Sequence, residues 1–487
     1  MNQVEYSGWE HEHIHDNRNQ FIDVLKHRLG DSPDIIYRDI VYGNTSVLIV
    51  YVEGMSDPKS LIDGMLDTVD VADSCKEESP EQAYERLKKQ GIALGRVRDT
   101  DHYTELISAL LAGGSIIFVE GHSICLLVGT ESLNQRGVEE ASSQSVVRGP
   151  REGFTESLRN NTALVRRRIQ SPMVRIEQRR LGEQTRTNIA IMYMEGMADE
   201  DVLNELRSRL DRIQLPSVLE SSYIEEMIQD RRYSPFPTIF NSERPDVIAS
   251  AILEGRVAIL MEGTPFVLIV PSLFVQAFQS SEDYYQRADF ASLVRLLRYF
   301  CFVLALLTPS FYIAITTFHQ EMIPTNLLIS LIGQREGVPF PAFVEALIME
   351  ITFEILREAG IRLPKSIGQS VSIVGTLVIG QAAVDAGLVS AAMVIVVAIT
   401  AIANFALPAF NLGISVRILR FLLMAIAASF GLYGIMISLI IIALHLCSLQ
   451  SLGVPYMSSL APLKRNSQKD TLLRLSQRMV KKHFREN

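Results

Sequence analysis

The sequence contains few cysteines and no apolar run near its start. Its 487 residues include only Cys75, Cys125, Cys301 and Cys447, without the spacing of a metal-binding or paired motif. A disulfide framework is therefore not expected, and a reducing or membrane-buried setting fits this cysteine usage better. The first 30 residues are polar, so we expect no secretory signal peptide.

Motifs of the common enzyme classes are also missing from the sequence. It contains no phosphate-binding loop, nucleophile elbow, metal-binding helix motif or dinucleotide-binding fingerprint. We therefore expect no enzymatic activity, no catalytic residues and no cofactor. The stretch HEHIH offers His11, His13 and His15 to a transition metal. The alternative is a mobile tail with incidental histidines, which we favour, so no metal site is expected.

The composition changes near residue 290. The chain is 48% hydrophobic with a mean hydropathy of +0.17, but before this point charges interrupt every apolar run. A helix needs roughly 20 apolar residues to cross about 30 Å of hydrocarbon. Four runs approach or exceed that length, at 299–318, 367–384, 388–410 and 420–446. Gly431 and Gly434 could kink the last of these runs. Parts of 323–361 are ambiguous, so we predict four to six membrane helices.

Charged and aromatic residues predict how these helices are oriented. The net charge is −9, yet the last 24 residues contain eight basic and two acidic residues. Basic residues also precede the first apolar run, so both termini are predicted to be cytoplasmic, with an even number of crossings. The basic tail is expected to contact anionic lipid rather than nucleic acid. The predicted anchors at the membrane interface are Tyr284, Tyr285, Arg295 and Arg298.

The part before the apolar runs contains an internal duplication. IVYVEGMSD at 49–57 matches IMYMEGMAD at 191–199, and FVEGHSICLLVG at 118–129 matches LMEGTPFVLIVP at 260–271. Both matches have the same offset of 142 residues, which indicates duplicated subdomains. Each copy predicts a buried strand, a helix and a strand–turn–strand unit. The arginine-rich stretch between the copies is either a lipid- or phosphate-binding surface or, as we expect, a solvated connector.

The predicted fold class is therefore two tandem α+β subdomains in the cytosol, followed by an all-α multi-pass transmembrane domain. The predicted divisions are a polar tail (1–30), a first α+β subdomain (31–147), a basic connector (148–186), a second α+β subdomain (187–288), a transmembrane domain (289–450) and a basic cytoplasmic tail (451–487).

Several long motifs resemble a known family. The segments 148–154 (RGPREGF), 235–287, 318–327 (FHQEMIPTNL), 338–364 and 379–390 (IGQAAVDAGLVS) are similar to those of GerA-type spore germinant receptor A subunits. The resemblance implies a multi-pass protein of the spore inner membrane, working with a transporter-like B subunit and a lipoprotein C subunit. It further implies oligomerisation into a channel that releases monovalent cations when a nutrient is sensed. A paralogous class amplifies germination instead.

Three glutamates form a stripe in the segment EALIMEITFEILREAG. Glu350, Glu354 and Glu358 recur at every fourth residue, so a helix would place them on one face. The stripe could line an ion pathway, because carboxylate rings attract cations. It could instead lie at the membrane surface with Glu358 paired to Arg362, or pack against neighbouring helices.

A second stripe consists of small residues. Gly368, Ser372, Thr376 and Gly380 also recur at every fourth residue. In lipid, such a face lets helices approach closely, and in an oligomer it could line a pore. A channel-forming subunit is thus the leading hypothesis. The alternatives are a non-conducting scaffold subunit and a secondary transporter, for which the expected inverted repeat is missing from the apolar half.

Overall fold

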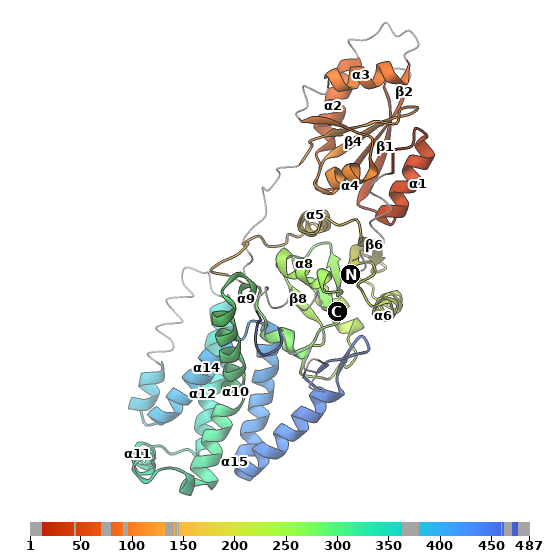
Figure 1. The fold of residues 1–487 in the computed structure, drawn as a ribbon. Coiled ribbons are helices and arrows are strands. Elements are labelled where there is room, and N and C mark those ends of the chain that lie inside the picture. The colour runs from red at the N-terminus through yellow and green to blue at the C-terminus, as the bar shows by residue number, and fades with distance from the viewer. Residues whose placement is uncertain are drawn as a thin grey trace. The chain divides into compact units, whose positions relative to one another are not determined.

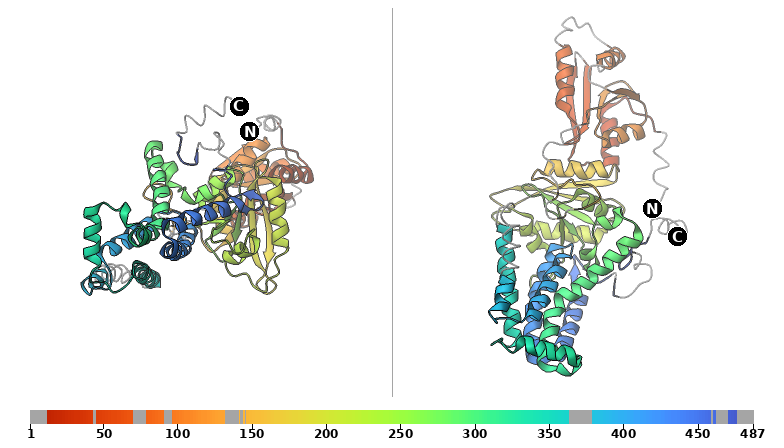
Figure 2. Two further views of the ribbon diagram at one scale, coloured as in Figure 1. Left: turned by 90° about the horizontal axis from the view of Figure 1, so that it is seen from below. Right: turned by 90° about the vertical axis from the view of Figure 1, so that its left-hand side faces the viewer.

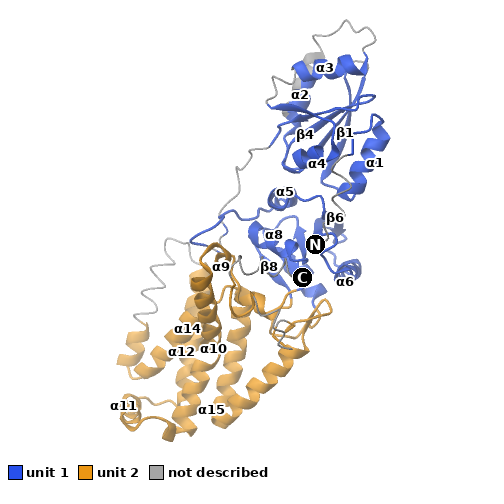
Figure 3. Ribbon diagram, in the orientation of Figure 1, with its two compact units in different colours: residues 1–229, 239–271 blue, residues 230–238, 272–487 orange. Residues whose placement is uncertain are grey.

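The structure is a computed structural model. It describes part of the chain, which divides into two compact units. The described residues are 12–42, 45–69, 79–90, 96–131, 141, 144, 146–362, 379–458, 460–461 and 470–475. Unit 1 comprises residues 1–229 and 239–271, and unit 2 comprises residues 230–238 and 272–487 (Figure 3). Strands and helices alternate in unit 1, whereas unit 2 is mainly helical (Figure 1).

The first half of unit 1 is a five-stranded antiparallel sheet with helices on both faces. Its strands follow the order β1-β2-β4-β5-β3. Its elements are α1 (Arg18–Leu29), β1 (Ile35–Tyr42), β2 (Thr45–Val52), α2 (Pro58–Val69), α3 (Pro80–Gln90), β3 (Val97–Thr100), α4 (Tyr103–Leu111), β4 (Ser115–Val119) and β5 (Cys125–Val128).

The sequence of strand β2 is a continuous apolar run because both faces of the strand are buried. Leu48 and Val50 enter a core shared with α1 and α4, whereas Val47 and Ile49 enter a second core shared with α2 and α3. Successive side chains of a strand point to opposite faces, so a strand buried on both faces must be apolar throughout. The predicted buried strand is confirmed.

The second half of unit 1 repeats this architecture. Its strands follow the equivalent order β6-β7-β9-β10-β8. Its elements are α5 (Leu158–Arg168), β6 (Val174–Leu181), β7 (Thr187–Met194), α6 (Glu200–Asp211), α7 (Ser221–Ile228), β8 (Phe240–Ser242), α8 (Pro245–Leu253), β9 (Val257–Met261) and β10 (Val267–Val270).

The duplication extends beyond the two matching motifs. The helices α4 and α8 begin 142 residues apart, as do β4 and β9. The first two strands of each sheet also pair alike, from Ile35↔Val52 to Tyr42↔Thr45 and from Val174↔Met194 to Leu181↔Thr187. The predicted tandem α+β subdomains are therefore present.

The boundaries of the two subdomains in the structure differ from the boundaries that the sequence predicts. Helix α1 lies within the expected polar tail, yet Phe21, Leu25 and Leu29 are buried in the first core. Likewise α5 and β6 lie within the expected connector and contribute to the second core. Each repeat thus begins with a helix before its first strand. These helices carry no copy of the matching motifs, which is why the prediction began each subdomain too late.

A buried ion pair joins the two halves of unit 1. Arg166 of α5 donates to both carboxylate oxygens of Asp34, at 2.9 and 3.2 Å. Its remaining donors reach Ser32 Oγ and the carbonyl of Val174, both at 2.9 Å. Only 1% of the Arg166 side chain and 6% of that of Asp34 are exposed. This basic residue of the expected solvated connector is therefore a structural link.

Unit 2 is built around helices that pack side by side (Figure 2). A core of apolar side chains from α10, α12, α14 and α15 holds them together. Its elements are η4 (Phe274–Phe278), α9 (Glu282–Tyr285), α10 (Ala288–Phe318), η5 (Gln320–Met322), α11 (Thr325–Arg335), α12 (Ala342–Arg362), α14 (Ala391–Phe405), α15 (Phe410–Ser448), β11 (Gln450–Ser451) and β12 (Val454–Pro455).

The helices of unit 2 expose much apolar surface. Helices α10 and α15 are long and apolar enough to cross a membrane, and 28% of the residues in the most apolar window of each are buried. Helix α14 is apolar but shorter. Large exposed side chains on these helices include Phe300, Phe311, Ile402, Phe405, Phe430, Tyr433 and Leu444. A surface of this kind suggests contact with lipid or with other chains.

A glycine interrupts α15, as its sequence predicts. Gly431 has φ 59° and ψ −146°, a conformation outside the helical region. The expected kink is therefore confirmed at Gly431. Of the four predicted apolar runs, 299–318 lies in α10, 420–446 lies in α15, and 388–410 contains α14. Most of 367–384 lies outside the described residues.

Candidate functional site

The polar centre of unit 2 lies on α12, which carries the glutamate stripe. Helix α12 contacts α10, α14 and α15. The three glutamates of the stripe become more exposed toward the end of the helix: Glu350 is buried, Glu354 is partly exposed, and Glu358 is exposed. The structure thus places the stripe so that it runs from the interior of the helical unit to its surface.

Glu350 faces an arginine in the apolar interior. Its Oε2 lies 2.8 Å from Nη2 of Arg420 in α15, and 1% of each side chain is exposed. Neither carboxylate oxygen, however, has a hydrogen bond among the described residues. A buried carboxylate without a hydrogen bond lowers the stability of a fold. It can therefore accept a further donor or a cation.

Glu354 connects the stripe to two more arginines. It forms ion pairs with Arg357 on its own helix and with Arg417 at 2.9 Å, and it lies 3.5 Å from Arg420. Two carboxylates and three guanidinium groups thus form one cluster, which we call the α12–α15 charge cluster. Its formal charge is positive, so within one chain the stripe is not a bare acidic surface.

Glu358 has the partner that the sequence suggested. It pairs with Arg362 one helical turn later, with Nε of Arg362 donating to Oε1 at 2.8 Å. Two of the three interpretations weighed from the sequence therefore each describe part of the stripe. Glu350 packs against a neighbouring helix, and Glu358 forms the predicted surface pair. The role of the stripe in an ion pathway stays a prediction.

A fourth glutamate on α12 lies outside the stripe. Glu345 is fully buried and accepts hydrogen bonds from the backbone N–H and the hydroxyl of Ser390, at 3.1 and 2.9 Å. Ser390 caps the N-terminus of α14, where a negative charge is favourable. Arg335 of α11 also donates to Glu345, at 3.2 Å. This site was not predicted from the sequence, although a serine before an apolar run is a recognisable N-cap signal.

The predicted interface anchors take part in contacts within unit 2. Arg295 is fully buried, 3.2 Å from Asp283 and 2.9 Å from Asp470. Arg298 also pairs with Asp283, at 2.8 Å, and the hydroxyl of Tyr284 donates to Asp470. These side chains hold the start of α10 to the segment 470–475. The adjacent Tyr285 is partly exposed.

The small-residue stripe is described only at its last member. Gly368, Ser372 and Thr376 lie outside the described residues. Gly380 is buried, and a Cβ atom at this position would lie 3.6 Å from Cγ1 of Val394 in α14. The stripe therefore ends close to a neighbouring helix, while its packing or pore role stays a prediction.

The fold and this site define a two-part class of protein. A duplicated α+β unit is joined to a helical unit in which two of the described helices are long and apolar enough to cross a membrane, which suggests membrane association. Residues 23–485 match the family model described as Bacillus/Clostridium GerA spore germination protein. The chain belongs to this family, and the resemblance to GerA-type germinant receptor A subunits is confirmed.

Curated relatives match over nearly the full chain. Spore germination protein KA of Bacillus subtilis (strain 168) is 48% identical over 453 residues, covering 92% of this chain and 83% of the relative. Spore germination protein GerLA of Bacillus cereus is 37% identical over 459 residues, covering 94% of this chain and 93% of the relative.

A solved structure also resembles this chain. It is the crystal structure of the N-terminal domain of the A subunit of the Bacillus megaterium spore germinant receptor GerK3. That domain is 33% identical, with a TM-score of 0.43, and the match covers 54% of this chain and 98% of the domain.

Proposed function

We propose that this chain is a channel-forming subunit of a nutrient-sensing germinant receptor in the spore inner membrane. In this proposal unit 2 spans the bilayer several times with both termini on the cytoplasmic side, and several copies surround a path for monovalent cations. A transporter-like B subunit and a lipoprotein C subunit complete the receptor. The proposed role is not enzymatic.

The buried carboxylate of Glu350 is the observation that supports conduction. A charge in the middle of a bilayer is unfavourable by about 2.5–3.5 kcal/mol or more, so such residues usually have a role. Glu350 also lacks a hydrogen bond among the described residues. A carboxylate in this state can exchange its arginine partner for a passing cation.

The experiment is cation conductance of the purified full chain in planar bilayers. The test variants are Glu350→Gln and Glu354→Gln, and Glu336→Gln is the control because the same change is made on an exposed glutamate of the same unit that lies outside the stripe. We expect a cation-selective current that falls at least about tenfold in the test variants, since charges of one sign that line a path can raise the local counter-ion concentration by about tenfold or more. The control should conduct like the unchanged chain.

A double variant separates conduction from folding. Glu350→Gln alone leaves Arg420 buried without its main partner, which destabilises a fold. Glu350→Gln combined with Arg420→Gln removes both charges and avoids this problem. If the double variant conducts normally, Glu350 is not part of the ion path, and the small-residue stripe becomes the next position to test.

The ion pairs themselves favour a second candidate function. In the α12–α15 charge cluster, arginines face both Glu350 and Glu354, and guanidinium groups repel cations. The cluster would then lock the helices in one arrangement, and the chain would be a non-conducting scaffold or signal-transducing subunit, or an amplifying paralogue. An absence of current from properly folded oligomers would favour this function.

A further inference from the structure

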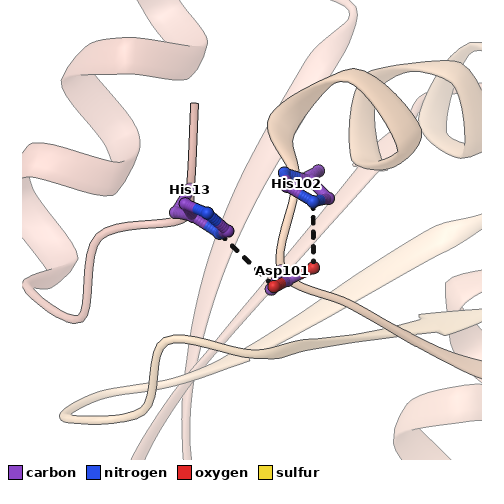
Figure 4. A group of neighbouring side chains, drawn as sticks. All are labelled: His13, Asp101 and His102. Atoms are coloured by element: carbon purple, nitrogen blue, oxygen red, sulfur yellow. Dashed lines mark ion pairs between the residues drawn. The ribbon is translucent and has the colours of Figure 1, made fainter. Parts of the chain in front are cut away.

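Three potential metal ligands meet where β3 leads into α4, in unit 1. They are His13, Asp101 and His102, and their ligand atoms all lie within 4.8 Å of one another (Figure 4). His13 precedes α1, whereas Asp101 and His102 lie between β3 and α4. The group therefore joins two segments that are far apart in the chain.

The carboxylate of Asp101 bridges the two imidazole rings. His13 Nδ1 lies 3.3 Å from Asp101 Oδ2, and His102 Nε2 lies 3.5 Å from Asp101 Oδ1. The ring centroids of the two histidines are 4.6 Å apart. Tetrahedral zinc with bonds of about 2.0–2.1 Å holds its ligand atoms about 3.3 Å apart. A small closing movement of exposed side chains would therefore complete the site.

The backbone holds the two histidines opposite each other without a metal. His13 and His102 form an isolated antiparallel bridge. On either side of it, Ile14 N–H donates to Asp101 O at 2.9 Å, and Tyr103 N–H donates to Glu12 O at 3.4 Å. Directly opposed residues of an antiparallel pair have Cβ atoms about 4.5–5.5 Å apart. The two imidazoles are therefore brought together by the fold rather than by chance rotamers.

The ligand set suits a divalent transition metal. Two imidazoles and one carboxylate are the ligands of several three-residue zinc sites, where water occupies the open position. The side chains of His13, Asp101 and His102 are 68%, 50% and 35% exposed, so water and metal can reach them. An ordinary ion pair at the surface would explain one histidine beside the carboxylate of Asp101. Here, however, each of the two carboxylate oxygens lies close to a different imidazole.

We propose that His13, Asp101 and His102 bind a divalent metal ion of the zinc class. The bound ion fastens the N-terminal segment 12–16 to the start of α4. Of the three histidines in HEHIH, His13 alone contributes to this group within the described residues. The ring of His15 lies beside that of Tyr103, with centroids 6.2 Å apart. His11 lies outside the described residues.

The test is calorimetric titration of the metal-free full chain with zinc chloride. The variants are Asp101→Asn and His102→Ala, and His15→Ala is the matched control within the HEHIH stretch. Loss of an outer-sphere partner already weakens metal sites about 10–100-fold, so loss of a ligand should weaken zinc binding at least about tenfold. His15→Ala should bind zinc like the unchanged chain.

Two results would overturn the proposal. One is zinc binding that survives in Asp101→Asn and His102→Ala but is lost in His15→Ala, because the HEHIH stretch would then chelate the metal by itself. The other is no binding by the unchanged chain at micromolar zinc.

A second measurement needs no variant. Hydrogen exchange of the amides of residues 12–16 should slow when zinc is added to the unchanged chain, since the bound ion would hold this segment in place. Unchanged exchange under saturating zinc would contradict the fastening role.

Discussion

The carboxyl group of Glu225, in α7, lies in a setting that disfavours its charge. Burial raises its pKa to about 7, the nearby charge of Glu220 adds to the rise, and a hydrogen bond with Asn241 partly offsets it. The pKa of Glu220 itself is lowered, because hydrogen bonds from Thr264 and Ser222 outweigh the effect of burial. Two glutamates close together thus have opposite shifts.

The raised pKa of Glu225 predicts how stability depends on pH. A carboxyl group whose pKa is higher in the folded than in the unfolded chain stabilises the fold when it is protonated. This contribution is fully present below the pKa of the group in the unfolded chain, near 4.5. This contribution is lost as the pH rises through about 7. Glu225→Gln should therefore raise the free energy of unfolding at pH 8 by at most about 3 kcal/mol and have little effect at pH 4.5.

Denaturant unfolding of the purified full chain at the two pH values checks this prediction. Glu226→Gln is the control, because Glu226 is the exposed neighbour on the same helix. Equal effects of Glu225→Gln at both pH values would contradict the raised pKa.

At the scale of an element, α15 depends on the glycine at its interruption. The φ and ψ angles of Gly431 lie in a region that is essentially restricted to glycine. A Cβ atom there would also lie 2.8 Å from Cε1 of His319 and 3.1 Å from Cβ of Phe318. The interruption therefore requires both the backbone freedom and the small size of glycine.

Gly431→Ala should destabilise unit 2. Strain in this region of φ and ψ costs about 1–3 kcal/mol, and the contact with His319 adds to it. We expect a lower midpoint of thermal unfolding for the detergent-purified chain. Gly333→Ala in α11 is the matched control, since no described residue beyond its chain neighbours and the backbone of its own helix lies within 4 Å of the added Cβ. It should be neutral or stabilising, and equal midpoints for both variants would contradict the role of Gly431.

At the scale of the whole molecule, unit 1 contains two similar sheets, and contacts between its two halves hold them together. Each half of unit 1 has its own sheet, and α5 joins the two halves: Ala163 packs in the first core, and Arg166 binds Asp34 and Ser32. Removing one partner of a buried ion pair leaves a charge without compensation, which usually costs about 3–5 kcal/mol. The link therefore contributes to the stability of unit 1 as a single body.

Arg166→Ala should lower the free energy of unfolding by about 3–5 kcal/mol. The control is Arg167→Ala, at the neighbouring and more exposed residue, for which a much smaller change is expected. The double variant with Asp34→Ala should regain part of the loss, because no buried charge then remains. Chemical denaturation of the full chain measures all three. A double variant no more stable than Arg166→Ala would show that the ion pair is not the cause.

Local patterns were enough to predict several features. The apolar run of β2 indicated a strand buried on both faces, the two matching motifs indicated a duplication, and Gly431 indicated a break in a long helix. These properties depend on residues near one another in the chain, or on similarity between two segments. Both can be read along the sequence without knowing which elements pack together.

The tertiary structure decided which partner each charged residue meets. The spacing of the glutamates placed them on one face of a helix, but it did not reveal that Arg420 of another helix faces Glu350. Likewise, His13 stands opposite His102 because a β-bridge joins two distant segments, and Arg295 is buried because Asp283 and Asp470 surround it. Charges interact through space over a few ångströms, so their partners depend on how the chain folds back on itself.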